Sequence, residues 1–319
     1  MLRNPMSRLW IVATAAALVL GGIALVQGSQ PQAVPKDGKR GNWKELTPEA
    51  KRVIEDCGTE RAFTGKFLNH KEKGTYTCAR CDAPLFSSET KFDSGSGWPS
   101  FDDAIDGAVK ELPDPDGRRV EIRCARCDGH LGHVFRGEKM TAKNTRHCVN
   151  SVSLGFANGP RSEAFFAGGC FWGVEHLLEE VPGVIRADSG YMGGHVKAPS
   201  YKAVTSGRSG HAETVRVIFN PEVVTYEELA RLFFEIHDPT HVDRQGPDRG
   251  PQYRSAVFVT DSEQERIAYK LIGLLQKKGL KVATKVEAAD VFWPAEDYHQ
   301  DYYKKTGKAP YCHSYVKRF

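Results

Sequence analysis

The sequence Arg146-His147-Cys148-Val149-Asn150 is followed, after a short interval, by Gly168-Gly169-Cys170-Phe171-Trp172-Gly173. Residues 157–161 lie between these two stretches and form a short segment with glycine and proline that is typical of a link between domains. Two cysteines in different sequence contexts therefore stand on either side of one junction. We expect Cys148 to lie near the end of one domain, residues 43–156, and Cys170 near the start of another, residues 162–319.

Length and composition agree with two globular domains. The chain has 319 residues, of which 40% are hydrophobic and 26% are charged, so each half is long enough to bury its own core. The formal net charge is only +4, and no tract combines dense lysine and arginine with aromatic residues. We therefore expect no nucleic acid partner.

The beginning of the chain has the pattern of an export signal. Arg3 and Arg8 precede an uninterrupted apolar run at 9–26, and the chain then turns polar. We interpret residues 1–28 as a signal peptide or a membrane anchor and 29–42 as a linker, with cleavage and retention both open. A buried core helix is the alternative, which the lack of amphipathic spacing disfavours. Basic residues keep that end in the cytoplasm, so we expect the rest in the periplasm or on the outer face of the inner membrane.

The first half reads as a mostly antiparallel β domain. Thr47-Pro48-Glu49 has a helix-capping residue, a proline at the first helical position and an acid in the first turn, which predicts a short helix ending near residue 56. From Tyr76 onward, short β-prone runs alternate with glycine, proline and aspartate clusters.

Two C-x-x-C motifs fall in this half, at Cys78-Ala79-Arg80-Cys81 and Cys124-Ala125-Arg126-Cys127. Two such turns bring four thiolates to one tetrahedral ion, so the spacing predicts a structural Zn²⁺ site. A pair of thiol–disulfide exchange motifs is the alternative, although neither motif follows an obvious strand–helix unit.

Cys148 is accompanied by residues that suit a nucleophilic thiolate. Arg146 supplies positive charge that lowers a thiol pKa, and His130 and His133 supply proton donors. Taken alone, the two histidines are equally well read as further metal ligands or as surface groups on a strand.

The second half alternates strands and helices. An apolar strand at 164–167 ends at a glycine pair, and a helix at 174–180 follows, so Cys170 falls at a helix N-terminus where a thiolate is favoured. The further expected elements are strands at 214–219, 255–260 and 281–286 and helices at 226–236 and 263–278. The pattern predicts a two-layer α/β sandwich, while a parallel and a mixed sheet both remain open.

Polar and aromatic loops connect these elements, at 190–195, 210–213, 248–255 and 298–300. Each loop alone is explained by a solvated turn. Glu213, however, directly precedes an apolar strand, and a carboxyl at the edge of an apolar pocket has a raised pKa and can act as a general acid.

Residues 43 to 156 resemble the type B methionine sulfoxide reductase family. The resemblance rests on the two C-x-x-C motifs, Gly58-Thr59-Glu60, Ser94 to Phe101, Gly129 to Phe135 and Arg146 to Ser151. It implies that Cys148 is the nucleophile and that Arg146 stabilises its thiolate. It further implies that Trp98 packs on the substrate methyl group and that three residues position the sulfoxide oxygen, namely His130, His133 and Asn150.

One departure from the family concerns the second thiol. Many members carry a resolving cysteine where this chain has Ser96, and serine cannot form a disulfide. Cys57 is the other free thiol of this half, and we expect it to resolve Cys148. A small buried cysteine with no redox role is the alternative.

Residues 162–319 resemble the type A methionine sulfoxide reductase family, most specifically in Gly168 to Gly173 and in Gly210-His211-Ala212-Glu213. By this resemblance Cys170 attacks the sulfoxide sulfur, Phe171 and Trp172 form the methyl pocket, and Glu213 protonates the oxygen. Three further residues would assist, namely Tyr201, Asp248 and Tyr253. Cys312 stands where the family's resolving cysteine is expected, with an incidental surface thiol as the alternative.

The two resemblances together imply a bifunctional enzyme that reduces the R epimer in its first domain and the S epimer in its second, with repair of oxidised envelope proteins as the expected role. Each nucleophile would become a sulfenic acid and then a disulfide, which thioredoxin or another dithiol must reduce. We expect zinc and no organic cofactor, either free or protein-bound methionine sulfoxide as substrate, and a tether through residues 9–26 if the leader is retained.

Two other classes of protein explain part of the cysteine pattern. A general thiol–disulfide exchange protein predicts C-x-x-C at the active thiol, which Cys148 and Cys170 lack. A zinc-ribbon binding module explains the two C-x-x-C motifs but assigns no purpose to Glu213 or to residues 168–173.

Overall fold

The structure is a computed structural model that describes residues 43–114 and 117–319. The expected leader and linker therefore lie outside the described residues, which all belong to one compact unit. No helix among the described residues is long and apolar enough to cross a membrane.

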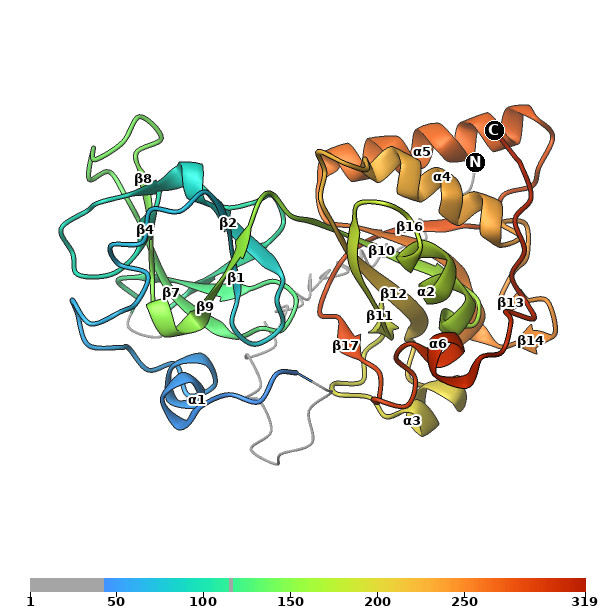
Figure 1. Ribbon diagram of the computed structural model, residues 1–319, viewed down its shortest axis with the longest axis horizontal. Helices are drawn as coiled ribbons and strands as arrows, with labels where there is room; N and C mark the ends of the chain where they lie inside the picture. The colour runs from blue at the N-terminus through green and yellow to red at the C-terminus, as the bar shows by residue number, and fades with distance from the viewer. Residues whose placement is uncertain (1–42, 115–116) are drawn as a thin grey trace, which may run out of the picture. The chain divides into compact units, whose positions relative to one another are not determined.

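The first half contains two antiparallel sheets, as the sequence predicted (Figure 1). The smaller sheet pairs β1 (Gly74–Cys78) with β2 (Pro84–Ser87) on one side and with β9 (Leu154–Asn158) on the other. The larger sheet has, in spatial order, β3 (Lys91–Phe92), β4 (Ser100–Phe101), β8 (Thr145–Val149), β7 (His130–Arg136), β6 (Val120–Cys124) and β5 (Val109–Pro113). Single turns of 3₁₀ helix stand at Ser88–Thr90 and Ser151–Ser153.

The core of this half is formed by apolar side chains from both sheets. Phe86 of β2 stacks on Phe101 of β4 with ring centroids 4.4 Å apart, and Tyr76 of β1 meets Phe101 edge-on. The predicted helix is α1 (Pro48–Ile54), and the hydroxyl of Thr47 accepts a hydrogen bond from the amide of Ala50, which confirms the cap.

The second half is a six-stranded sheet covered by helices, so the predicted α/β sandwich is confirmed. Its spatial order is β16 (Lys285–Ala288), β15 (Ser255–Val259), β10 (Ser162–Gly168), β12 (Ala212–Phe219), β11 (Val184–Met192) and β17 (Trp293–Pro294). A separate hairpin pairs β13 (Arg244–Gln245) with β14 (Asp248–Arg249), and a 3₁₀ turn follows at Pro251–Tyr253. Only β15 and β16 run parallel, so the sheet is mixed.

One face of the mixed sheet packs against the long helices. These are α2 (Phe171–Glu179), α4 (Tyr226–Ile236) and α5 (Ser262–Lys277), while α3 (Tyr201–Thr205) and α6 (Tyr302–Thr306) are short. Side chains of β10 alternate between two apolar clusters, with Ala164 and Phe166 on the helix side and Phe165 and Ala167 on the other.

One expected strand is placed differently. The sequence predicted a strand at 281–286, whereas β16 covers Lys285–Ala288. Leu280 and Val282 do pack against the helix-side core, but the amide of Ala283 donates to the carbonyl of Pro239 at 2.7 Å and not to a sheet partner. Apolar residues therefore marked burial here without marking a strand.

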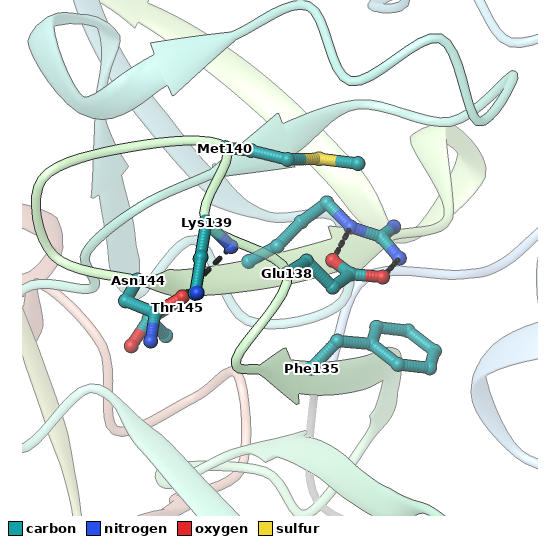
Figure 2. Close-up of a pocket in the computed structure, with 7 residues that line it drawn as sticks. Phe135, Glu138, Lys139, Met140, Asn144 and Thr145 are labelled. Carbon is teal, nitrogen blue, oxygen red and sulfur yellow. Dashed lines mark hydrogen bonds and ion pairs between the residues drawn. The ribbon is translucent and has the colours of Figure 1, made fainter.

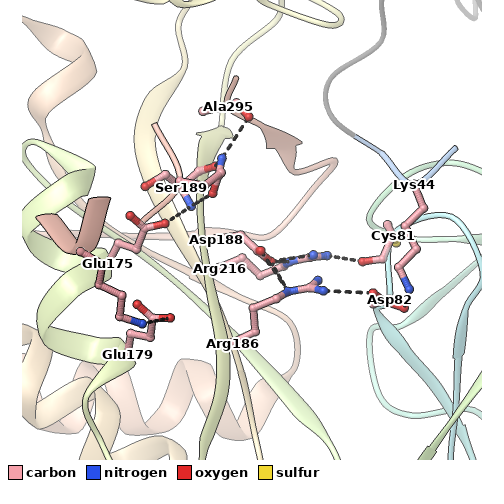
Figure 3. Close-up of polar contacts among 12 residues, drawn as sticks. Lys44, Cys81, Asp82, Glu175, Glu179, Arg186, Asp188, Ser189, Arg216 and Ala295 are labelled. Carbon is pink, nitrogen blue, oxygen red and sulfur yellow. Dashed lines mark hydrogen bonds and ion pairs between the residues drawn. The ribbon is translucent and has the colours of Figure 1, made fainter. Parts of the chain in front are cut away.

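The turns that carry the C-x-x-C motifs also contact the mixed sheet, and Figure 3 shows the contacts of the first turn. Arg216 of β12 is buried, and its guanidinium donates to the carbonyl of Cys81 at 2.8 Å and pairs with Asp188 at 2.8 Å. Beside it, Arg186 of β11 pairs with Asp82 at 3.0 Å. The first C-x-x-C turn is thus held by cations from two neighbouring strands.

The second C-x-x-C turn makes a buried ion pair with the same sheet. Arg126 pairs through its Nε with the Glu163 carboxylate of β10, and its guanidinium lies over the Phe165 ring, 5.1 Å from the centroid. The side chains of Arg126 and Glu163 are only 2% and 5% exposed. A charge so buried depends on its partner, since water cannot replace the lost contact.

We therefore predict that Glu163→Gln destabilises the fold, because it leaves the Arg126 charge buried without an anionic partner. The free energy of unfolding should fall by roughly 3 kcal/mol or more. In a urea titration this appears as a lower midpoint of the first unfolding transition that is met as urea increases. Arg266→Gln is the matched control, since Arg266 pairs with Glu263 on the exposed face of α5, and it should leave the midpoint unchanged. Equal midpoints for Glu163→Gln and the native chain would contradict the prediction.

Candidate active sites

The cysteines of the two C-x-x-C motifs meet in one buried cluster of four. The Sγ atoms of Cys78 and Cys127 are 3.6 Å apart, as are those of Cys81 and Cys124, and all four lie within 4.8 Å of one another. A disulfide requires about 2.05 Å between sulfurs, so neither contact is one. Zn²⁺ bound at about 2.3 Å from each of four sulfurs places them roughly 3.8 Å apart. The cluster therefore has the donors and the spacing of a closed tetrahedral metal site.

Cys148 lies on β8 in the middle of the larger sheet. It stands opposite His133 of β7 on one side and Ser100 of β4 on the other. Burial raises the pKa of the Cys148 thiol, and the charge of Arg146 acts in the opposite direction. The hydroxyl of Ser96, which stands where many family members carry the resolving cysteine, is 4.0 Å from the Cys148 sulfur.

Arg146 is fixed by an acid that sequence reasoning did not single out. Its guanidinium makes two bonds to the carboxylate of Glu138, at 2.7 and 2.9 Å, and lies over the ring of Phe135, 4.4 Å from the centroid. Figure 2 shows Glu138 and Phe135 in the shallow hollow that this loop forms, where the Lys139 amide also donates to Asn144 at 2.8 Å. Glu138 therefore orients the cation that faces Cys148.

His130 and His133 lie near each other, with ring centroids 5.7 Å apart. The Nδ1–H of His130 donates to Glu121 of β6 at 2.6 Å, since a carboxylate only accepts, and its Nε2 is buried with no partner among the described residues. His133 bonds through Nε2 to Asp114 at 2.8 Å. Burial raises the pKa of Glu121, but hydrogen bonds from His130 and Arg123 prevail and lower it to about 2.

Cys57 belongs to the same neighbourhood. Its sulfur lies within 4.8 Å of ligand atoms of Glu121 and His130, and Arg123 donates to it at 3.5 Å. Cys57 is exposed, in contrast to the buried thiol that was the alternative expectation. Desolvation raises the pKa of Cys57 and the Arg123 charge opposes that shift.

Trp98 and Asn150 are both hydrogen-bonded to Glu60, a residue of the Gly58-Thr59-Glu60 motif to which no role was assigned from sequence. The Trp98 indole donates to the Glu60 carbonyl at 3.1 Å, and the Glu60 amide donates to the Asn150 side chain at 3.0 Å. The Glu60 carboxylate accepts from the amides of Ser151 and Val152. The Asn150 amide also donates to a backbone carbonyl, which leaves one of its N–H groups for a ligand.

Cys170 caps the N-terminus of α2, as the sequence predicted. Gly169 has a φ of +99°, and a Cβ there would fall 2.3 Å from the Gln245 side chain, so the turn before Cys170 requires glycine. The expected lowering of the Cys170 pKa is wrong for this structure. A hydrogen bond with Cys312 and then burial raise it, and the Trp172 amide at the helix end opposes them only in part.

Cys312 lies beside Cys170, although they are far apart in the sequence. Ligand atoms of Cys170, Asp248 and Cys312 all lie within 4.8 Å of one another. Tyr311 donates to the Asp248 carboxylate at 2.9 Å, which ties the segment that carries Cys312 to β14. Cys312 is half-buried, in contrast to the exposed Cys57.

Glu213 lies within β12 and not before it, close to the start of α2. Its carboxyl accepts a hydrogen bond from the Phe171 amide at 3.1 Å. Burial, reinforced by the nearby Cys170, raises the pKa of Glu213 well above the ordinary value. Burial, together with the negative charge of ionised Glu213, raises the pKa of Tyr201 to about 12. The same two effects raise the pKa of Tyr253.

The aromatic side chains next to Cys170 are held by a histidine to which no role was assigned from sequence. The Trp172 indole donates to His299 Nδ1 at 3.1 Å, and its ring stacks on Tyr302 at 3.8 Å between centroids. The His299 ring also lies 5.0 Å from Phe171 and 4.4 Å from Tyr201. Burial lowers the pKa of His299 to about 4, so it accepts this bond as a neutral ring.

The raised pKa of Glu213 has a testable effect on stability. A carboxyl with a raised pKa in the folded state binds a proton there that the unfolded chain has lost, so the free energy of unfolding declines as pH rises above about 4.3, by about 1.4 kcal/mol per unit for one group. Glu213→Gln should remove this contribution and flatten the decline, which urea titrations from pH 4 to pH 8 would measure. Parallel curves for the two proteins would show that Glu213 is ionised in the fold.

Comparison with known proteins assigns both halves of the chain. Residues 162–319 match the model of peptide methionine sulfoxide reductase, and residues 46–158 match the SelR domain. The Deinococcus radiodurans peptide methionine sulfoxide reductase MsrA is 44% identical over 180 residues, which cover 55% of this chain and 87% of that protein. The Sulfolobus acidocaldarius MsrA is 47% identical over 150 residues, covering 47% and 85%.

A solved structure is also similar. The reduced form of Mxr1 from Saccharomyces cerevisiae is 36% identical, with a TM-score of 0.46, and the match covers 49% of this chain and 92% of that one. The family assignment rests on the sequence matches, which agree with the two resemblances noted from the motifs. The chain therefore belongs to the peptide methionine sulfoxide reductase family, with a SelR domain, the type B reductase, followed by a domain of the MsrA type.

Proposed function

We propose that the chain divides the reduction of methionine sulfoxide between two separate cysteine pairs. The sulfur of a sulfoxide is chiral, so two enzymes of opposite specificity are needed, one for each epimer. The SelR domain reduces the R epimer and the MsrA domain the S epimer. In our proposal Cys148 acts with Cys57 in the first domain, and Cys170 acts with Cys312 in the second.

In the MsrA domain, the observation that carries the proposal is the buried carboxyl of Glu213, which accepts a hydrogen bond from the amide of Phe171, the residue after Cys170, and whose pKa is raised by burial. Cys170 sulfur attacks the sulfoxide sulfur, and Glu213 gives its proton to the oxygen as negative charge develops there. The oxygen passes to Cys170 as a sulfenic acid, and methionine leaves. Phe171 and Trp172 receive the methyl group, while the neighbouring Tyr201, Tyr253 and Asp248 complete the polar side of the pocket.

In the SelR domain, Cys148 attacks in the same way and other groups serve the oxygen. The buried Nε2 of His130 has no partner among the described residues, and it can donate to a bound sulfoxide oxygen when both ring nitrogens carry a proton, with Nδ1–H bonded to Glu121. His133 and the remaining N–H of Asn150 are assigned to the same oxygen, and Trp98 to the methyl group. Arg146, held by Glu138, favours the thiolate form of Cys148.

Two observations support Cys57 as the resolving thiol of Cys148. Ser96 occupies the position next to Cys148, so no thiol is supplied from that loop. Cys57 lies beside His130, one of the residues assigned to the sulfoxide oxygen, and its exposure gives it access to a sulfenic acid at the same site.

The cluster of Cys78, Cys81, Cys124 and Cys127 would hold one structural Zn²⁺. Its support is the set of four buried sulfurs at spacings that suit a tetrahedral ion. Such a site contributes to folding and takes no part in the redox steps, because all four coordination positions are filled by protein.

Each disulfide must be reduced from outside, and a thioredoxin-like protein or another dithiol is the chemical class that does so. The basic residues and the apolar run within residues 1–28 support export to the periplasm or to the outer face of the inner membrane. Residues 9–26 would serve as a membrane tether if the leader is retained. Oxidised envelope proteins, or free methionine sulfoxide there, would then be the substrates.

The division between domains is tested with an equal mixture of the two epimers. Cys148→Ser should leave the R epimer unreduced, and Cys170→Ser should leave the S epimer unreduced. Each substitution should lower the rate for the affected epimer alone by roughly 10³-fold, because the attacking sulfur is absent. Chiral chromatography of the remaining sulfoxide measures both rates at once. Equal loss of both epimers from one substitution would contradict the division.

The assignment of Cys57 has a test that uses the geometry around Ser96. Cys57→Ser should keep one turnover of the R epimer and lose steady-state recycling by a dithiol, with S-epimer turnover as the internal control. Adding Ser96→Cys should restore recycling, since it places a thiol where a hydroxyl now lies 4.0 Å from the Cys148 sulfur. Normal recycling in Cys57→Ser alone would rule out the assignment.

A further inference from the structure

His313 follows Cys312 directly and has no role in the chemistry described above. It is buried, and each of its ring nitrogens has one partner. The Nε2 atom lies 2.8 Å from the carbonyl oxygen of Gly168, and the Nδ1 atom lies 3.0 Å from the sulfur of Cys312. The histidine thus connects the strand end before Cys170 to the second thiol of the same site.

These two contacts fix where the ring carries its proton. A carbonyl oxygen only accepts, so Nε2 must be the protonated nitrogen and must donate to Gly168. In a neutral imidazole the other nitrogen then has a free lone pair. Nδ1 is therefore an acceptor, and the hydrogen of the contact at 3.0 Å comes from the Cys312 thiol.

The surroundings keep the ring neutral and in place. Three ionisable groups act on it from neighbouring elements: Asp248 of β14, His237 after α4, and Cys312 itself. Cys170, at the start of α2, lies within 4.8 Å of Cys312. Burial lowers the pKa of His313, against smaller opposing effects from the Gly168 carbonyl and Asp248. A Cβ added at Gly173 would fall 2.3 Å from Nδ1, so the glycine that follows Trp172 on α2 gives the ring its space.

We propose that His313 is the general base that removes the proton of Cys312 when Cys312 attacks the oxidised Cys170. This inference rests on the proposed assignment of Cys312 as the resolving thiol. It adds a catalytic residue to the disulfide-forming step and leaves the sulfoxide-reducing step to Cys170 and Glu213.

The proposed step balances as follows. The Cys312 S–H proton moves to Nδ1 of His313, and the resulting thiolate attacks the sulfur of the Cys170 sulfenic acid. The S–S bond forms as the S–O bond of Cys170 breaks, and the departing hydroxide takes a proton from the imidazolium to leave as water. The sulfur of Cys312 is oxidised, that of Cys170 is reduced, and His313 returns to its neutral state.

The test follows one turnover of the full-length protein with one equivalent of the S epimer of methionine sulfoxide. Samples are quenched in acid, and methionine and the Cys170–Cys312 disulfide are quantified from the same time points by mass spectrometry. His313→Gln keeps an amide that can donate to Gly168 but has no basic nitrogen. It should leave the methionine burst unchanged and slow disulfide formation at pH 7 on the order of 10²-fold.

The pH profile separates a base from a structural element. In the native protein the disulfide rate should be level through the neutral range. In His313→Gln it should rise about tenfold per pH unit and approach the native rate at high pH, because ionisation of the thiol by solvent then replaces the missing base. His313→Asn is the second variant with the same expectation, and His241→Gln, on a half-exposed loop histidine, is the matched control that should change nothing.

Three outcomes would overturn the inference. A native rate and profile in both His313 variants would show that no base is needed, while the thiol assignment would stand. Loss of the methionine burst without recovery at high pH would show a structural role. Absence of a Cys170–Cys312 disulfide in the native protein would refute the assignment of Cys312 itself.

Discussion

The sulfurs of Cys78, Cys81, Cys124 and Cys127 form one buried cluster in the SelR domain. The positions of the neighbouring residues depend on this cluster. Cys124 ends β6, the strand that also carries Glu121 and Arg123. Glu121 orients His130, and Arg123 contacts Cys57. An ion that fixes Cys124 would therefore also fix the strand whose side chains contact His130 and Cys57.

The same cluster reaches the MsrA domain through its turns. The carbonyl of Cys81 accepts a hydrogen bond from Arg216, and Arg126 pairs with Glu163. Arg216 and Glu163 lie on central strands of the mixed sheet. Strand β10, which carries Glu163, ends at Gly168, just before the glycine turn and Cys170. Residues with no part in the redox chemistry thus connect the cysteine cluster to the strand from which the second nucleophile begins.

In our proposal the two nucleophiles, Cys148 and Cys170, meet the same chemical demand with different groups. Near Cys170, burial raises the pKa of the Glu213 carboxyl and so favours the protonated form, which we propose as the proton donor to the sulfoxide oxygen. Beside Cys148 the carboxylates are ionised and act through others: Glu121 holds His130 and Glu138 holds Arg146. Proton donation is direct in one domain and passes through histidine in the other.

Local sequence was sufficient for features that depend on neighbouring residues. The C-x-x-C pairs, the Thr47 cap and the glycine turn before α2 are of this kind. It was insufficient where a distant residue decides: Cys312 reverses the pKa shift expected for Cys170 from its helix end alone, and His313 meets Gly168 across 145 positions. Glu60 likewise bonds Asn150 across 90 positions, so its role could not be read from its own motif.

The claim that the reactive thiols form two closed pairs has a direct measurement. The reduced full-length protein would be oxidised with excess sulfoxide of both epimers, without reductant, and mapped under non-reducing conditions. The account predicts disulfides 57–148 and 170–312, with the cysteines at 78, 81, 124 and 127 unmodified. A disulfide between Cys148 and Cys170, or any disulfide within the four-cysteine cluster, would contradict it.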